Sequence, residues 1–129
     1  MSEAMPRRIP RLVAGMAFLA ALVLSSPLKA QDAAKIAKGD SLFNGKQMGA
    51  CWACHGKGGK GTSVAPSLAD ATWLNIDGSE AAIRGLIPVG VPKPKKAKAA
   101  MPPMGGGKLT DDQMDALAAY VFSLRGAKK

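Results

Sequence analysis

The sequence has few of the side chains on which most enzyme active sites and metal sites depend. Its 129 residues include one histidine and two cysteines, and aromatic residues make up only 5% of the chain. A single histidine excludes any chemistry that needs two histidines from one chain. The shortage of aromatic residues indicates a thin hydrophobic core. The length suits one ordinary domain and is too short for two.

Acidic residues are scarce as well. Nine Asp and Glu stand against 18 Lys and Arg, which gives a formal net charge of +9. Glycine and proline are abundant, with 15 and 9 residues, and they predict a fold rich in loops. The chain has no internal repeat, and no long stretch alternates apolar and polar residues as a β-strand does. We therefore predict an all-α fold.

The first thirty residues have the pattern of a secretory signal. Three arginines among the first eleven residues precede an uncharged apolar run over residues 12–24, which is shorter than the ~20 residues that span a bilayer. We expect cleavage after Ala30, which leaves residues 31–129 in the periplasm without stable membrane insertion; an uncleaved anchor is the alternative. Removing residues 1–30 takes away four basic residues and one acidic residue, which lowers the formal charge from +9 to +6.

Helical patterns occur at two places before the C-terminal region. The first covers residues 33–43 after a predicted N-cap at Asp32, and the second opens at Ser79 and ends before Pro88. Residues 45–72 contain many glycines, so we predict irregular backbone there, in the loop that carries the functional site.

The last helix has the clearest pattern. It follows the capping box Thr110-Asp-Asp-Gln113 and is predicted to end at a Gly126 C-cap. Its apolar residues recur at helical spacing and are predicted to face the core: Met114, Leu117, Val121 and Leu124.

Both cysteines and the only histidine lie together in Cys51-Trp-Ala-Cys54-His55. C-x-x-C-H is the attachment signature of c-type haem. Two thiols at this spacing can add to the two vinyl groups on one edge of a porphyrin, and the next residue can place its imidazole under the iron. We therefore predict one covalent haem c with iron, attached through Cys51 and Cys54 and bound by His55.

Three other interpretations of the motif fit the chain less well. A zinc site would need two further ligands from scattered carboxylates. A thioredoxin-like site needs a βαβ framework that the sequence does not predict. A structural disulfide across so short a loop would add little stability and would leave His55 without a role.

The ligand on the other side of the iron can be narrowed down from the sequence. With no second histidine, it is a methionine, a lysine or an open position. Met48 is too close to the attachment site, and Met114 belongs to the predicted core of the last helix. Met101 and Met104 remain, in a segment that its prolines keep out of a helix. A core-filling role for both is the alternative.

Residues 32–125 as a whole resemble class I c-type cytochromes. The resemblance is carried, in chain order, by Gly39, Phe43, the Cys51–His55 motif with Gly56, Pro66, Met101-Pro102, Leu117 and Tyr120. The same residues are also similar to the haem domains of terminal-oxidase subunits and of small cytochromes that serve periplasmic dehydrogenases.

The resemblance implies a cytochrome c-like fold of three to four helices around one haem. It implies that Gly39 and Phe43 pack against the last helix, that the Pro66 carbonyl accepts a hydrogen bond from His55, and that Met101 is the axial sulfur. Met104 is the second choice for that ligand.

An iron with two protein ligands has no open position for a substrate. We therefore expect a periplasmic one-electron carrier rather than an enzyme. One alternative is a cytochrome subunit of a periplasmic redox complex, for alcohol or thiosulfate oxidation. Another is a haem enzyme or sensor with a displaceable methionine.

The remaining positive charge indicates the kind of partner. Lysines follow the attachment motif and precede Met101, and a ring of them around the haem edge would steer redox proteins with an acidic docking surface: Lys57, Lys60, Lys93, Lys95, Lys96 and Lys98. The segment from Pro88 to Lys98 is longer and more basic than is usual in the family, and keeping a long loop solvated is the alternative role for its lysines. Nucleic acid is not an expected partner of an exported protein without interleaved aromatic residues.

Overall fold

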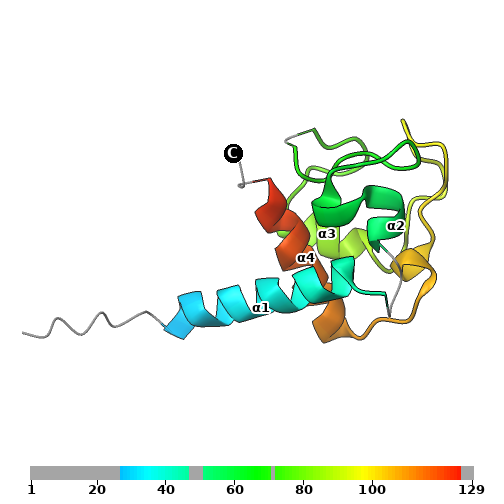
Figure 1. The fold of residues 1–129 in the computed structure, drawn as a ribbon. Helices are drawn as coiled ribbons and strands as arrows, with labels where there is room; N and C mark the ends of the chain where they lie inside the picture. The colour runs from blue at the N-terminus through cyan, green and yellow to red at the C-terminus, as the bar shows by residue number, and fades with distance from the viewer. Residues whose placement is uncertain (1–26, 47–50, 71, 126–129) are drawn as a thin grey trace, which may run out of the picture.

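Figure 1 shows the computed structural model, which describes residues 27–46, 51–70 and 72–125. Its helices are α1 (Pro27–Asn44), α2 (Cys51–His55), α3 (Glu80–Leu86) and α4 (Asp111–Leu124), with short 3₁₀ turns η1 (Lys57–Gly59) and η2 (Pro103–Gly106). The described residues contain no strand, only an isolated antiparallel bridge between Val91 and Met101. The predicted all-α fold is confirmed. None of the helices in the described ranges is long and apolar enough to cross a membrane.

The close crossing of α1 and α4 forms the base of the fold. Gly39 is buried where the helices meet, and a Cβ atom there would overlap the Ala116 carbonyl oxygen and lie 2.6 Å from Tyr120 Cβ. One turn later, the Phe43 and Tyr120 rings pack 5.4 Å apart at a tilt of 53°. Because only glycine lacks a Cβ, the sequence at position 39 sets how closely the two helices approach.

Helix α1 starts earlier than predicted. It begins at Pro27, so Asp32 lies inside the helix and the predicted N-cap there is wrong. Residues 28–38 are mostly Ala, Lys, Leu and Gln, which favour a helix, and nothing in this stretch ends one. The expected cleavage point after Ala30 falls inside α1, and the remainder of the predicted signal, residues 1–26, lies outside the described residues.

Helices α3 and α4 begin where their caps predict. The Ser79 hydroxyl accepts a hydrogen bond from Ala82 N, and Thr110 and Gln113 form both bonds of the capping box. Three of the four predicted core positions of α4 are buried, and Leu124 is half-buried. The predicted C-cap Gly126 lies outside the described residues.

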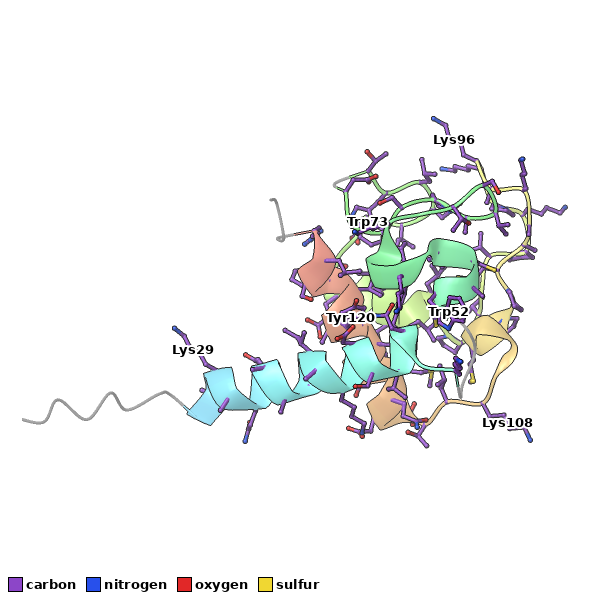
Figure 2. The ribbon with its side chains drawn as sticks, in the orientation of Figure 1. Lys29, Trp52, Trp73, Lys96, Lys108 and Tyr120 are labelled. Atoms are coloured by element: carbon purple, nitrogen blue, oxygen red, sulfur yellow. The ribbon has the colours of Figure 1, made fainter. Side chains whose placement is uncertain are left out.

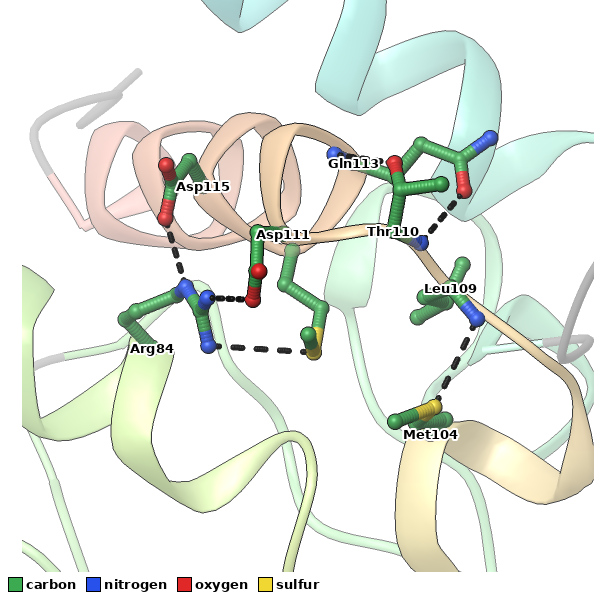
Figure 3. Close-up of polar contacts among 8 residues, drawn as sticks. Arg84, Met104, Leu109, Thr110, Asp111, Gln113 and Asp115 are labelled. Atoms are coloured by element: carbon green, nitrogen blue, oxygen red, sulfur yellow. Dashed lines mark hydrogen bonds and ion pairs between the residues drawn. The ribbon is translucent and has the colours of Figure 1, made fainter.

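Arg84 connects α3 to α4 (Figure 3). Its guanidinium donates to Asp111 at 2.7 Å and to Asp115 at 2.5 Å, and it also approaches the sulfur of Met114. This two-carboxylate contact links α3 to α4 at the surface, beside the buried Ile83 that packs α3 into the core. It matters for the functional site because the segment that carries Met101 is attached to the end of α3.

We predict that Gly39→Ala destabilises the protein. The added methyl group should cost about 2 kcal/mol through the forced separation of α1 from α4, even after the better helix propensity of alanine is counted. Denaturant unfolding followed by circular dichroism measures the change. The matched control is Gly85→Ala in α3, where a Cβ would meet nothing within 4 Å, and it should stabilise by up to ~1 kcal/mol. A Gly39→Ala variant as stable as the wild type would contradict the close crossing.

Candidate functional site

The predicted site residues line one cavity. Cys51, Cys54, His55, Met101 and Met104 all contribute to its wall, although they come from α2 and from a segment some fifty residues later. Most of the remaining lining is apolar and includes Phe43, Leu68, Ile83, Ile87, Leu117 and Val121. The cavity is suited to a large apolar group that meets sulfur and imidazole at its polar points.

A hydrogen bond orients the His55 imidazole. Its Nδ1 lies 3.1 Å from the carbonyl oxygen of Pro66, so the tautomer protonated at Nδ1 donates to that oxygen and leaves Nε2 with its lone pair. Burial lowers the pKa of His55, although the bond to Pro66 opposes this shift. The neutral imidazole is therefore favoured, and it is the form that binds a metal.

The loop after His55 places Pro66 beside the imidazole. Gly61 N donates to the His55 carbonyl at 2.6 Å, and Gly56 has a φ of 76° in a turn where a Cβ would lie 2.9 Å from the Gly61 carbonyl oxygen. The glycines that predicted an irregular loop thus turn the chain back over His55.

Helix α2 was not predicted, because glycines dominate its surroundings. Cys51 and Cys54 lie three residues apart on it, on one face of a single helical turn. The Trp52 indole donates to the Gly45 carbonyl at 3.1 Å and so attaches α2 to the end of α1. Burial is the main cause that raises the pKa of Cys51, and Cys54 is exposed.

Met101 and Met104 occupy different environments. Met101 is paired through its backbone with Val91, and within the described residues its sulfur accepts no hydrogen bond. The sulfur of Met104 accepts one from Leu109 N at 3.4 Å (Figure 3), and the Met104 side chain packs against the core. Met104 also has a left-handed φ of 52°, which its contacts must hold in place. The two sulfurs thus differ in that the Met104 sulfur accepts a backbone hydrogen bond and, among the residues that the structure describes, the Met101 sulfur does not. Met48 lies outside the described residues.

Trp73 is a residue of the cavity wall that the sequence analysis did not assign to the site. Its indole Nε1 is buried and has no hydrogen-bond partner in the described part of the chain, and Gly78 lies flat against the ring. A buried donor without a partner costs folding free energy, and a carboxylate of a bound group could accept its hydrogen bond. A haem, with an apolar ring and carboxylate side chains, fits a cavity of this composition. Trp73 could have been singled out from the sequence, because it is one of few aromatic residues in the chain and lies between Pro66 and α3.

The described residues offer little support for zinc. They contain no group of three or more His, Cys, Asp or Glu side chains that could hold a metal ion. The C-x-x-C-H motif therefore stands beside an apolar cavity and two methionines, without further ligands of the kind that structural zinc sites use.

The lysines of residues 92–98 lie on the outer side of the cavity wall. Val91, Pro94 and Ala97 line the cavity, while the lysines between and after them are exposed. Lys98 N donates to the Val64 carbonyl at 3.2 Å, which attaches this segment to the loop before Pro66. Figure 2 shows Lys96 pointing away from the body at the far end from Lys29.

Comparison with known proteins agrees with this geometry. Residues 36–125 match the family described as Cytochrome c. The chain is 38% identical over 94 residues to the Cbb3-type cytochrome c oxidase subunit FixP of Bradyrhizobium diazoefficiens, which covers 71% of this chain and 28% of FixP. It is 38% identical over 97 residues to subunit CcoP of Azospirillum sp., covering 70% and 31%, and 34% identical over 116 residues to CcoP of Rubrivivax gelatinosus, covering 88% and 34%. The chain thus spans about a third of the length of these relatives. No solved structure matches significantly.

We predict that Trp73→Phe lowers the reduction potential of the haem-loaded protein. An indole N–H that meets a haem carboxylate offsets its negative charge, and removing the donor favours the more positive ferric state. The protein should also lose about 1–3 kcal/mol of unfolding free energy. Potentiometry and denaturant unfolding measure both effects. In the control Trp52→Phe, the lost donor is bonded to Gly45 outside the cavity wall, and the potential should not change. An unchanged potential in Trp73→Phe would contradict a hydrogen bond from Trp73 to a haem carboxylate.

Proposed function

The chain belongs to the cytochrome c family, whose members transfer electrons through a covalently bound c-type haem, and from this premise we propose that it is a periplasmic one-electron carrier with His55 and Met101 as axial ligands. Cys51 and Cys54 would attach the haem by thioether bonds. The observation that carries the proposal is the bond from His55 to the Pro66 carbonyl, in a cavity that Met101 also lines.

The ligand residues suit electron transfer rather than catalysis. Pro66 holds the imidazole in one orientation and tautomer, and Met101 brings an uncharged sulfur from a segment anchored by its backbone. Two uncharged ligands in an apolar cavity favour the less charged ferrous state, so the potential is raised. Because both axial positions are occupied, the chain acts as a carrier and is not itself an enzyme.

The partner proposed for this carrier is a redox protein with an acidic docking surface. The four lysines of residues 93–98 are exposed on the outer side of the cavity wall, and none of them forms an ion pair within the described ranges. Their positive potential therefore extends into solvent beside the group that exchanges electrons. This arrangement steers acidic proteins to that side.

A second candidate function is a cytochrome subunit of a periplasmic redox complex. The likeness to FixP and CcoP, which are subunits of an oxidase, favours it over an alcohol or thiosulfate system. Purification from the native host separates the two functions. Co-elution with a large redox subunit supports the subunit, and elution as a small haem protein supports the independent carrier.

We predict that Met101→Ala abolishes the weak red absorption band of a ferric iron–thioether bond. The protein should then bind carbon monoxide rapidly in the ferrous state, because the sixth position opens. Met104→Ala is the matched control and should keep the band, since its sulfur is directed to Leu109 N. If the band persists in Met101→Ala and disappears in Met104→Ala, Met104 is the ligand.

We predict that Lys95→Gln with Lys96→Gln slows oxidation of the ferrous protein by ferricyanide by roughly tenfold at low ionic strength. Stopped-flow absorbance measures the rate, and the difference should vanish at high salt. The control pair Lys35→Gln with Lys38→Gln removes the same charge from α1, where both lysines pair with acidic residues, and should change the rate much less. Equal slowing in both double variants would show that only net charge matters and would contradict a docking surface at residues 93–98.

A further inference from the structure

We propose that Gly90 is a positioning residue for the axial sulfur of Met101. It lies just after α3, and the absence of a side chain there lets the backbone of Met101 and of the two prolines that follow it rest directly on the end of that helix. The inference rests on the proposed function, because it takes Met101 as the ligand. It adds that α3 determines where the sulfur is held.

The contact at Gly90 excludes every other residue. Gly90 is buried with a φ of 70°, a left-handed conformation that favours glycine. A Cβ at this position would overlap the Met101 carbonyl oxygen and lie 2.8 Å from both Pro102 C and Pro103 N. All three obstructing atoms belong to the backbone, so no side-chain rotation could relieve the overlap. An added methyl group must displace the Met101 segment itself.

Backbone hydrogen bonds hold the same segment on both sides of the methionine. Val91 N donates to the Met101 carbonyl at 2.8 Å, and Met101 N donates to the Val91 carbonyl at 3.0 Å. Further along, Met104 N donates to the Ile87 carbonyl at 2.7 Å. We call these three bonds, with the contact at Gly90, the α3 clasp.

The α3 clasp is anchored in the core. Gly90 N itself donates to the Leu86 carbonyl at 2.7 Å, so the turn at Gly90 continues directly from α3. Ile83 on α3 and Ile87 immediately after it are buried in the hydrophobic core, and Arg84 is bonded to two carboxylates of α4. The packed helices, rather than the surface loop before Met101, therefore determine where Met101 lies.

This anchoring separates the basic segment from the ligand. Residues 92–100 form a loop whose two ends, Val91 and Met101, are joined by backbone hydrogen bonds. A change in the length or charge of the segment between them need not move the paired residues. The chain can therefore carry a lysine-rich segment next to its axial ligand, and the exposed lysines of that segment are available for partner docking.

The test is Gly90→Ala in the haem-loaded full chain, measured by the ferric iron–thioether band, the reduction potential and carbon monoxide binding. We expect the band to lose most of its intensity, the potential to fall and carbon monoxide to bind quickly, while the helical circular dichroism is retained. The control is Gly58→Ala, which has a similar φ of 64° but would place its Cβ with nothing within 4 Å. It carries the same backbone strain and should keep the band and the potential.

A full-strength band and unchanged potential in Gly90→Ala would overturn the proposal, as would an equal loss in Gly58→Ala. If Gly90→Ala yields no folded protein, a second variant tests the proposal. It inserts Gly-Ser between Lys95 and Lys96, which are exposed and do not line the cavity, so it lengthens the basic segment without removing a residue of the cavity wall. The clasp then remains intact, and the band should persist; its loss would overturn the proposal.

Failure of the proposed function gives a different result. If Met101 is not the ligand, the wild-type protein lacks the iron–thioether band or Met101→Ala keeps it. Neither observation depends on Gly90. If Met101 is the ligand and Gly90→Ala leaves it undisturbed, the proposed function stands and only the positioning role of Gly90 is wrong.

Discussion

The close crossing of α1 and α4 at Gly39 is the constraint on which the other parts of the structure depend. It brings Phe43 against Tyr120 and places Asn44, the last residue of α1, where its amide donates to the Tyr120 hydroxyl at 3.1 Å. The side-chain oxygen Oδ1 of Asn44 also accepts a hydrogen bond from Gly58 N, in the turn that follows His55. A chain of contacts therefore runs from the helix crossing to the imidazole, and a separation of the two helices would move the site.

Two separate supports hold the site. The glycine-rich loop returns over His55 and fixes its imidazole through Pro66, while the end of α3 holds the segment of Met101. Each support is backbone rather than side chain, which suits a protein with few aromatic residues and a thin core. Backbone contacts are short and leave little freedom, so His55 and the segment of Met101 keep their places without the bulk of a larger interior.

The parts predicted from the sequence are those specified by local chemistry. The capping box fixed the start of α4, Ser79 and Pro88 bounded α3, and the C-x-x-C-H motif predicted the haem that the family carries. The start of α1 was misplaced because Asp32 can cap a helix or lie within one. Helix α2 was hidden by its glycine-rich surroundings. Gly90 and Trp73 escaped prediction because their importance arises from residues distant in sequence, which no local pattern reports.

The central claim is that His55 and Met101 bind the haem iron on opposite sides. The most direct measurement is the NMR spectrum of the ferrous protein with ¹³C-labelled methionine methyl groups, because a methyl group bound over the porphyrin is displaced far upfield by the ring current. We predict one displaced methyl resonance, and its absence from the spectrum of Met101→Ala should assign it to Met101. A spectrum without a displaced methyl group, or one in which the displaced group belongs to Met104, would contradict this arrangement.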